Sequence, residues 1–238
     1  MDVLLSGARR LGLSLTEAHL AKFRLLRDEL LQWNRRTNLT AITDPAEVEA
    51  KHFLDSLTVA LALLNGFTPG GKVIDLGTGP GFPGLPLAIV FPHTQFTFVE
   101  ATWKKTDFIA HVVKQLELAN VTIINERSET LAHQPQHRER YPVVLARALA
   151  PMPALAELTL PFCAVGGIVI ALKKGEMRQE VASAEKAIRL MGGRLGRQIP
   201  VPLPALNDGR VLVIVEKVGH TPTEYPRRPG IPATKPIL

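Results

Sequence analysis

The N-terminal part of the chain shows the spacing of apolar residues that is typical of an amphipathic helix. Its apolar positions are Leu20, Phe23, Leu26, Leu30 and Trp33. Because they recur three and four residues apart, they predict a helix that runs to about Arg35. Ser14 and Glu17 have the spacing of a capping box, in which two side chains bind backbone N–H groups at a helix start. We therefore expect this helix to begin just after Ser14.

A second helix is predicted from Asp44 to about Leu64. Asp44 suits the N-cap position and Pro45 suits the first helical position. Asn-Gly at 65–66 and Pro-Gly-Gly at 69–71 then interrupt the helical pattern. We place a domain boundary there, so that residues 1–66 form an N-terminal helical extension.

Beyond residue 71, short apolar runs alternate with amphipathic helical segments. The predicted strands are Lys72–Leu76, Gln95–Val99, Val121–Ile124, Pro142–Ala146, Gly167–Leu172 and Val211–Glu216. Helices are predicted between them, most clearly at Trp103–Leu118 and Glu176–Met191. This alternation predicts a mostly parallel sheet that helices cover on both faces.

The end of the pattern differs, since no helix fits between Leu195–Val201 and Val211–Glu216. These two segments are expected to pair as an antiparallel hairpin. A doubly wound, Rossmann-like α/β sheet of seven strands with such a final hairpin is the architecture of class I S-adenosylmethionine-dependent methyltransferases. We assign residues 67–218 to this domain and residues 219–238, which are rich in Pro and Arg, to an extended basic tail.

A candidate nucleotide site follows the first predicted strand. Gly77, Gly79 and Gly81 form a turn that opens a helix, and glycines let the backbone come close to a ligand there. Glu100 ends the second strand, where a carboxylate can accept hydrogen bonds from ribose hydroxyls. Strand, turn, helix and carboxylate in this order predict a cofactor that contains a nucleoside.

The residue at position 82 distinguishes between two kinds of cofactor. A dinucleotide fingerprint that starts at Gly77 requires a small residue there, and this chain has Phe82. A fingerprint that starts at Gly79 has the right glycines but sets the turn two residues beyond the strand. The string from Asp75 to Gly81 instead resembles the first motif of S-adenosylmethionine enzymes. We therefore favour a methyltransferase over the alternative of an NAD-linked oxidoreductase.

Composition restricts the setting in which the chain acts. Hydrophobic residues make up 46% and charged residues 21%, which is enough apolar material for a folded core. No apolar run reaches the ~20 residues that cross a bilayer, and the N-terminus lacks the features of a secretory signal. Cys163 is the single cysteine, so no internal disulfide or cysteine-based zinc cluster forms. We expect a cytoplasmic protein that binds neither metal nor membrane.

Five motifs in one order give a more specific resemblance. They are Trp33–Thr40, Lys51–Ser56, the glycine motif that ends at Gly84, Arg147-Ala148 and Ala171–Lys173. From about Ser14 to Lys217 the chain resembles the bacterial guanine-N7 methyltransferases of small-subunit ribosomal RNA, also called glucose-inhibited division protein B. The resemblance implies S-adenosylmethionine as methyl donor and S-adenosylhomocysteine as product. It also implies 16S ribosomal RNA, or its ribonucleoprotein, as the partner, and we expect the enzyme to act as a monomer.

The resemblance further implies a set of cofactor contacts. They are Gly77, Thr78, Gly79, Phe82, Glu100, Ala101, Thr102, Ser128, Glu129 and Arg147. All of them follow a predicted strand, and ligands of open α/β sheets lie beyond the carboxyl ends of the strands. Purely structural roles are the alternatives at two places, where Ser128 and Glu129 would cap a helix and Arg147 would be a surface residue.

Methyl transfer to guanine N7 requires no general base, because N7 carries a lone pair and no proton. The work of such an enzyme is to align N7 with the methyl carbon and the sulfur. Arg147 and Lys173 are the candidates for positioning the base, since Arg and Lys donate to guanine O6. Asn38, His52 and Lys173 are candidate substrate-binding residues, although Asn38 could instead turn the chain and His52 could be a core histidine.

Basic side chains are the expected RNA contacts, in keeping with a net charge of +6. They are Lys22, Arg24, Arg27, Arg35, Arg36, Arg138, Arg140, Lys173, Lys174, Arg178, Arg227 and Arg228. The aromatic residues are not arrayed as a stacking platform, and Trp33 is expected in the core. A guanine in a loop, or one flipped out of a duplex, is the expected target.

Missing motifs argue against other nucleic-acid methylations. Transfer to pyrimidine C5 needs a nucleophilic thiol, whereas Cys163, between Phe162 and Ala164, is expected to be a small core residue. Transfer to an exocyclic amine usually shows an Asp/Asn-Pro-Pro-aromatic turn after the fourth strand, where this chain has residues 146–149, Ala-Arg-Ala-Leu. A methyltransferase for another RNA, a small molecule or a protein stays open, as does a non-catalytic binding module.

Overall fold

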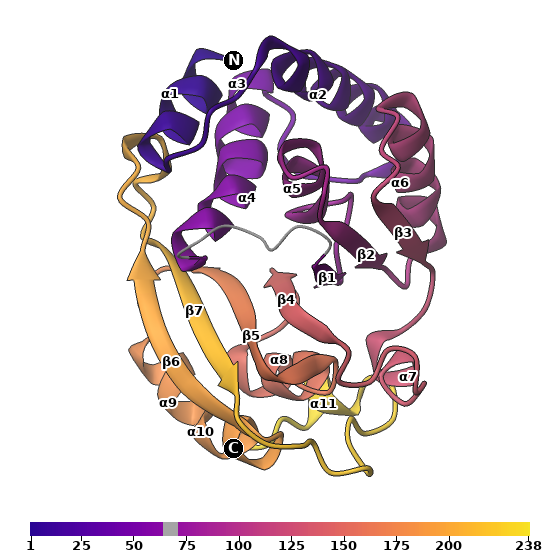
Figure 1. Ribbon diagram of the computed structural model, residues 1–238, viewed down its shortest axis with the longest axis vertical. Coiled ribbons are helices and arrows are strands. Elements are labelled where there is room, and N and C mark those ends of the chain that lie inside the picture. The colour runs from indigo at the N-terminus through magenta and orange to yellow at the C-terminus, as the bar shows by residue number, and fades with distance from the viewer. Residues whose placement is uncertain (64–70) are drawn as a thin grey trace.

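The computed structural model describes residues 1–63 and 71–238, and their strands form one seven-stranded sheet in the order β3-β2-β1-β4-β5-β7-β6 (Figure 1). The strands are β1 (Lys72–Leu76), β2 (Gln95–Val99), β3 (Val121–Ile124), β4 (Tyr141–Arg147), β5 (Cys163–Lys174), β6 (Gly193–Pro200) and β7 (Arg210–Lys217). The first five strands pair in parallel, whereas β7 is antiparallel to both β5 and β6. The predicted class I methyltransferase fold, including its final hairpin, is confirmed.

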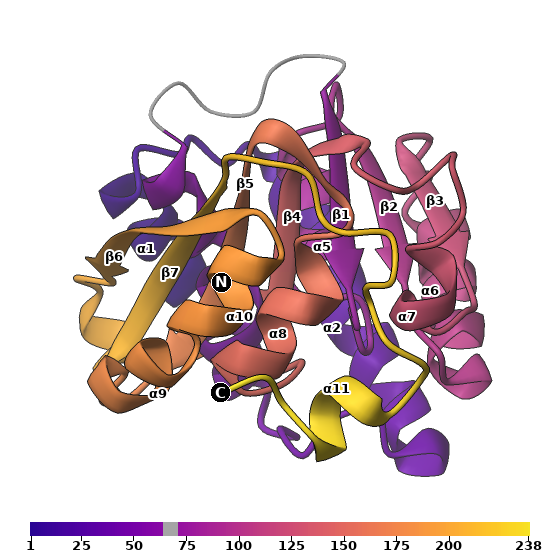
Figure 2. The same ribbon diagram turned by 90° about the horizontal axis from the view of Figure 1, so that it is seen from below.

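Helices cover both faces of this sheet. Before the sheet lie α1 (Asp2–Arg10), α2 (Glu17–Thr37), α3 (Pro45–Val48), η1 (Glu49–Leu54), α4 (Asp55–Leu57) and η2 (Thr58–Ala62). Between and after the strands lie α5 (Gly84–Val90), α6 (Trp103–Gln115), α7 (Ser128–Leu131), α8 (Met152–Thr159), α9 (Arg178–Ser183), α10 (Glu185–Leu190), η3 (Pro204–Leu206) and α11 (Ile231–Thr234). Figure 2 shows α8 and α10 on one side of the sheet and α1 and α2 on the other.

Two hydrophobic cores result from the alternation of side chains along the strands. In β1, Val73 belongs to the core that contains α1, α2, α5 and α6, whereas Ile74 belongs to the core that contains α8, α9 and α10. In β4, Leu145 belongs to the first of these cores and Val144 to the second. Strands that are buried on both faces read as continuous apolar runs, which is why the sequence identified them. The N-terminal helices thus share a core with the sheet.

The N-terminal helices differ in detail from the sequence prediction. The cap of α2 is Thr16, whose side chain accepts from the backbone N–H of His19, and the predicted box of Ser14 and Glu17 is wrong. The apolar pattern fixes the face of a helix but does not decide which of two nearby hydroxyls caps it. Helix α1 was not predicted at all. Its buried residues, Leu4, Gly7 and Ala8, make too short a pattern to identify in the sequence.

The second predicted helix begins as expected, since the Asp44 side chain accepts from the N–H of Glu47. It continues through the π-helical turns of η1 and the 3₁₀ turns of η2 to Ala62. The predicted end at Leu64, and most of the residues of the predicted boundary, lie outside the described residues. The helix predicted at Glu176–Met191 is two helices, α9 and α10, which are separated at Ala184.

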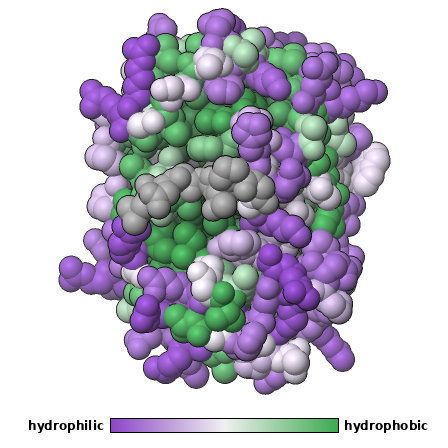
Figure 3. Space-filling view, in the orientation of Figure 1, coloured by the Kyte–Doolittle hydropathy of each residue, from purple (hydrophilic) through white to green (hydrophobic). Residues whose placement is uncertain are grey.

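Polar and apolar residues are also divided over the surface. Figure 3 shows hydrophobic side chains gathered in the middle of one face, with hydrophilic side chains along its rim. None of the helices in the described part of the chain has the length and apolar character needed to span a membrane.

Candidate functional site

The carboxyl ends of β1, β2, β3 and β4 lead into a pocket of about 280 Å³. Gly77 follows β1, Glu100 and Ala101 follow β2, and Ser128 and Glu129 begin the helix after β3. These five predicted cofactor contacts line the pocket together. Residues 148–150, after β4, form a further wall. Strand ends in open parallel sheets create such crevices, because the loops on either side of a crossover diverge there.

Glycine is required at the bend after β1. Gly77 and Gly79 have φ angles of +62° and +61°, in the left-handed region that favours glycine. A Cβ atom at Gly77 would lie 2.5 Å from Cδ1 of Leu149, which is far inside normal contact. At Gly79 no atom lies within 4 Å of that position. The bend therefore brings bare backbone to the rim of the pocket.

The carboxylate of Glu100 is fixed across this glycine bend. Its Oε2 accepts from the N–H of Gly79 at 3.1 Å, and its Oε1 accepts from the N–H of Thr102 at 2.8 Å. The side chain is buried, yet it lines the pocket. Because a carboxylate oxygen accepts more than one hydrogen bond, both oxygens retain acceptor capacity toward a ligand. Gly79 and Thr102, which do not line the pocket, support it through these bonds.

A second carboxyl group, Asp75, lies beneath the same bend and has no exposed surface. Its Oδ2 accepts from the Thr78 hydroxyl at 2.5 Å and from the N–H of Gly84 at 2.9 Å. Its Oδ1 has no hydrogen-bond partner among the described residues. Burial raises the pKa of Asp75 to about 7. Asp75 received no role from the sequence, although the motif that contains it was identified.

Ser128 and Glu129 face the pocket and do not cap a helix. The N-cap of α7 is Arg127, and no side chain caps that helix end, so the capping alternative is wrong. The Glu129 side chain is buried, and its Oε1 accepts from the N–H of Gly230 at 2.9 Å. Gly230 and Ala233, which belong to the last residues of the chain, also line the pocket. No pattern in the sequence predicted this contact.

Arg147 lies in a cluster beside the pocket and is not among the residues that line it. Its guanidinium donates to Oδ2 of Asp55 at 2.9 Å, to the carbonyl of Lys51 at 3.0 Å and to Nδ1 of His52 at 2.9 Å. It also lies 5.5 Å from the centre of the Phe82 ring. The side chain is 14% exposed, so the alternative of an ordinary surface arginine is wrong.

The π-helical turns of η1 supply the other side of this cluster, as such turns frequently do at functional sites. His52 is stacked on Phe82, and its Nε2 lies 2.8 Å from the Thr40 hydroxyl. Burial, Arg147 and Arg210 lower the pKa of His52 to about 3, so the imidazole is neutral. Phe82 is itself buried and contributes to the core.

Two further predicted substrate contacts have structural partners. Lys173 Nζ donates to the carbonyl of Ala150 at 2.8 Å and to Oε1 of Glu180 at 2.7 Å, which ties β5 to the wall formed by residues 148–150. Asn38 is the left-handed C-cap of α2, with a φ of +47°, as the chain-turning alternative expects. Trp33 packs against Phe108 in the first core, as predicted.

Several of the predicted RNA-binding bases are occupied within the protein. Arg27 pairs with Glu49, and Arg227 pairs with the buried Glu157. Arg138 donates to backbone carbonyls. Arg140 is exposed but donates from Nε to the carbonyl of Pro135 at 3.2 Å. The other exposed bases of the set are Arg35, Arg36, Lys174, Arg178 and Arg228. Among the described residues, no group of three or more His, Cys, Asp or Glu side chains is placed to hold a metal ion.

Residues 19–197 match the GidB family, which is described as rRNA small subunit methyltransferase G. The chain is 48% identical over 238 residues to a "Ribosomal RNA small subunit methyltransferase G" from Dehalococcoides mccartyi, with all of both chains covered. It is 46% identical to a protein of the same name from a Roseiflexus species, again with all of both chains covered.

Solved structures share the fold at much lower sequence identity. A SAM-dependent methyltransferase from Aquifex aeolicus superposes with a TM-score of 0.54 and 18% identity, covering 74% of this chain and 94% of that one. MtNAS in complex with S-adenosylmethionine gives a TM-score of 0.55 and 18% identity, covering 85% of this chain and 73% of that one.

Proposed function

The chain belongs to the rRNA small subunit methyltransferase G family, and on this premise we propose that it transfers the methyl group of S-adenosylmethionine to N7 of a guanosine in 16S ribosomal RNA. The observation that carries the proposal is the Glu100 carboxylate, which Gly79 and Thr102 hold across the glycine bend at the rim of the pocket. A carboxylate in that position binds the hydroxyls of a ribose.

The residues of the pocket fit this cofactor. Glu100 would hold the ribose, bare backbone at Gly77 would lie against the ligand, and Ser128 with Glu129 would contact the adenine. The Glu100 carboxylate, buried at the rim and supported by two backbone N–H groups, retains acceptor capacity for the two ribose hydroxyls of such a ligand. When bound, S-adenosylmethionine supplies a methyl group on a positively charged sulfur.

The chain's own residues would act by orientation. Guanine N7 is unprotonated, so no side chain has to remove a proton, and alignment of the reacting atoms contributes up to ~7–11 kcal/mol. Three of the five N–H groups of Arg147 are bonded within the protein, which leaves two that could direct the base. His52, kept neutral, would hold Arg147 in place and would not act as an acid. Lys173 would fix the loop at Ala150.

The exposed bases would bind the phosphates of the RNA. Arg35 and Arg36 lie at the end of α2, Lys174 ends β5, and Arg178 begins α9. Phosphate contacts of this kind position an RNA without reading its sequence. We propose that the enzyme acts as a monomer, in the cytoplasm, on the RNA or on its ribonucleoprotein.

The test is incubation of the purified chain with small ribosomal subunits and methyl-labelled S-adenosylmethionine, followed by aniline cleavage at N7-methylguanosine. Label in 16S RNA and cleavage at one guanosine are expected, and an excess of S-adenosylhomocysteine should suppress both. Binding of the cofactor without labelling of the RNA would point to another methyl acceptor. Binding of a nicotinamide dinucleotide in its place would overturn the proposal.

A further inference from the structure

The residues after β7 run past α7 and pack against α8 (Figure 1), and two of them enter the wall of the pocket that is proposed above to hold the cofactor, here called the cofactor pocket. Figure 1 shows this segment, in yellow, running from the end of β7 past α7 to α11. Gly230 and Ala233 from this segment line the same pocket as Glu100 and Ser128. We propose that residues 226–234 form a fixed wall of the cofactor site and set its affinity for the adenosyl part of the ligand. This inference rests on the function proposed above.

One anchor of this C-terminal wall is the ion pair between Arg227 and Glu157. Glu157 has no exposed surface, and its two carboxylate oxygens accept from Nε and Nη2 of Arg227 at 2.9 and 2.7 Å. Its Oε1 also accepts from the backbone N–H of Arg227 at 2.8 Å. Glu157 raises the pKa of Arg227, so the charge of the guanidinium persists. Movement of Arg227 away from Glu157 would leave a buried carboxylate without its partner, which is costly, so the ion pair holds the segment in place.

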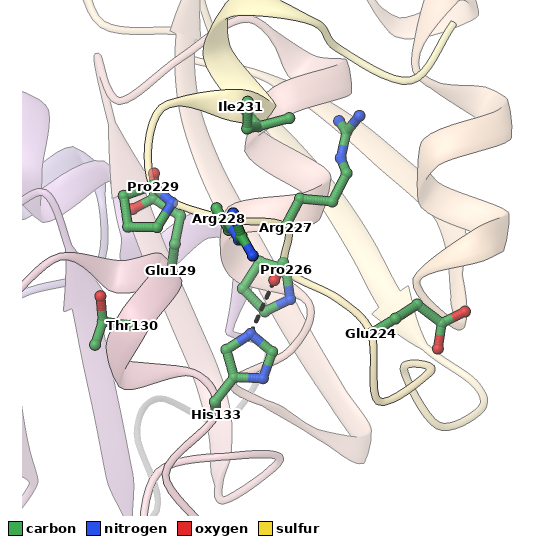
Figure 4. A pocket seen from close by; sticks show the side chains of 9 residues that line it. All are labelled: Glu129, Thr130, His133, Glu224, Pro226, Arg227, Arg228, Pro229 and Ile231. Carbon is green, nitrogen blue, oxygen red and sulfur yellow. Dashed lines mark hydrogen bonds between the residues drawn. The ribbon is translucent and has the colours of Figure 1, made fainter.

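A second anchor lies immediately before the wall. Arg138 donates to the carbonyls of Thr221, Pro222 and Tyr225 at 2.9 to 3.0 Å. The ring of His133 bonds to the carbonyl of Pro226 at 2.8 Å, as the dashed line in Figure 4 shows. The chain is therefore fixed at Pro226 by His133 and at Arg227 by Glu157, and the residues that follow have a defined path to the pocket.

Gly230 links this path to a predicted cofactor contact. Its N–H donates to Oε1 of Glu129, and its φ of +84° is a conformation that favours glycine. Within the described part of the chain, no hydrogen bond to Oε2 of Glu129 is present. Glu129 is thus oriented by the wall through one oxygen and is left with the other as acceptor. The exocyclic amine of adenine is a donor that suits such an oxygen.

The other side of the C-terminal wall is hollow. A pocket of about 630 Å³ lies between the segment and α7, and Glu129 lines this pocket as well as the cofactor pocket. Figure 4 shows Glu129, Thr130 and His133 facing the residues of the C-terminal segment across it. Because Glu129 lies between the two pockets, removal of the wall would expose its carboxylate to water and weaken its hydrogen bond to a ligand.

Ala233 gives the sharpest test, because it is exposed and borders the cofactor pocket. Ala233→Trp would place a large ring in that pocket without disturbing the core. The control is Leu238→Trp, at an exposed position beyond α11 and outside the pocket. With S-adenosylhomocysteine as the probe in calorimetry on the full chain, Ala233→Trp should raise Kd at least tenfold. Leu238→Trp should leave it within twofold of the unsubstituted protein.

A pair of shortened chains tests the C-terminal wall as a whole, including the contact of Gly230 with Glu129. The chain that ends at residue 229 lacks Gly230 and Ala233, whereas the chain that ends at residue 234 keeps both, and each lacks the contact of Arg227 with the Lys235 carbonyl. We expect a tenfold or greater rise in Kd for the shorter chain alone. A cooperative urea unfolding transition in each chain would show that both are folded. Equal affinities for Ala233→Trp and the unsubstituted protein, or for the two shortened chains, would overturn the inference. Failure of the unsubstituted protein to bind the probe would overturn the proposed function as well.

Discussion

The imidazole of His52 lies parallel to the ring of Phe82, with centroids 4.5 Å apart and an interplanar angle of 6°. Phe82 belongs to the glycine motif after β1, and His52 belongs to the π-helical turns of η1. The stack therefore joins the N-terminal helices to the loop that shapes the cofactor pocket. Arg147, which bonds to His52 and lies over Phe82, connects the end of β4 to the same point.

Because His52 is buried in its neutral form, it should make the protein sensitive to acid. The pKa of His52 is about 3 in the folded protein and 6.5 in the unfolded chain. Between these pH values the imidazole is therefore protonated in the unfolded chain and neutral in the folded protein. The stability that His52 contributes should fall as pH falls from 6.5 toward 3, by up to about 1.4 kcal/mol per pH unit. Asp75, whose pKa burial raises to about 7, contributes a slope of the opposite sign over this range, so the His52 contribution is the difference in slope between the unsubstituted protein and a His52 variant. Urea unfolding between pH 6.5 and 5 measures this slope.

The matched variants are His52→Phe, which keeps a ring over Phe82, and His93→Phe at an exposed position. We expect His52→Phe to lose this contribution, so that its stability falls less, or rises, as pH falls from 6.5 to 5, and His93→Phe to keep the slope of the unsubstituted protein. A His52→Phe protein with the same pH dependence as the unsubstituted protein would contradict the prediction.

Asp55 should matter more to stability than either of its arginine partners. Its Oδ2 lies 2.9 Å from Arg147 and 2.7 Å from Arg210, and its side chain is 2% exposed. Asp55→Ala leaves the mostly buried guanidinium of Arg147 without a carboxylate, beside Arg210, which keeps only Asp208, at a cost of about 3–5 kcal/mol. Arg210→Met leaves Asp55 paired with Arg147 and keeps an apolar stem, at about 1–2 kcal/mol. Denaturant unfolding compares the two, and equal losses would refute this account.

Glu100→Gln should weaken cofactor binding at least tenfold. The carboxamide has one oxygen, so its NH₂ group has to face the N–H of Gly79 or of Thr102, and two donors then meet. A hydrogen bond to a charged group contributes about 1.5–3 kcal/mol, which corresponds to a tenfold or greater change in Kd. Calorimetry with S-adenosylhomocysteine is the measurement. Glu117→Gln, at an exposed position outside the pocket, serves as the control.

The sheet could be predicted from the sequence because its central strands are buried on both sides. β1, β2 and β3 have the predicted bounds, since each is an apolar run between polar turns. The hairpin of β6 and β7 followed from the lack of room for a helix between them. The pocket could be predicted for a related reason, because Gly77 and Glu100 occupy strand ends, and strand ends meet wherever a parallel sheet forms.

Contacts between segments that are far apart in the chain could not be predicted from the pattern of apolar and polar residues. Asp55, which begins α4, and Arg210, which begins β7, are 155 residues apart in the sequence and are joined only in the folded chain. The contact of Gly230 with Glu129 spans 101 residues and depends on the anchors around Arg227. Arg147 was identified as a site residue, but its orientation into the cluster with Asp55 follows from burial and charge in the folded chain.

Lys173 and Lys174 should have separable roles. Lys173 is fixed to the Ala150 carbonyl and to Glu180, whereas Lys174 is exposed. Lys173→Met should lower the rate of methyl transfer at saturating RNA at least tenfold, because the loop at Ala150 loses its anchor. Lys174→Met should mainly weaken RNA binding, and that effect should shrink as salt increases. Single-turnover rates and binding curves at two salt concentrations measure both, and a larger rate loss for Lys174→Met would reverse the assignment.

Cys163 should be chemically silent in the folded protein. It begins β5 with no exposed surface, and burial raises the pKa of its thiol to about 12. The thiolate, which is the reactive form, is therefore negligible at neutral pH. Iodoacetamide should modify Cys163 only after unfolding, as mass spectrometry in the presence and absence of urea would show. Cys163→Ala should keep methyl transfer within twofold and lose about 1 kcal/mol of stability. Loss of methyl transfer in a folded Cys163→Ala protein would instead assign the thiol a part in the reaction, which guanine N7 as the nucleophile does not require.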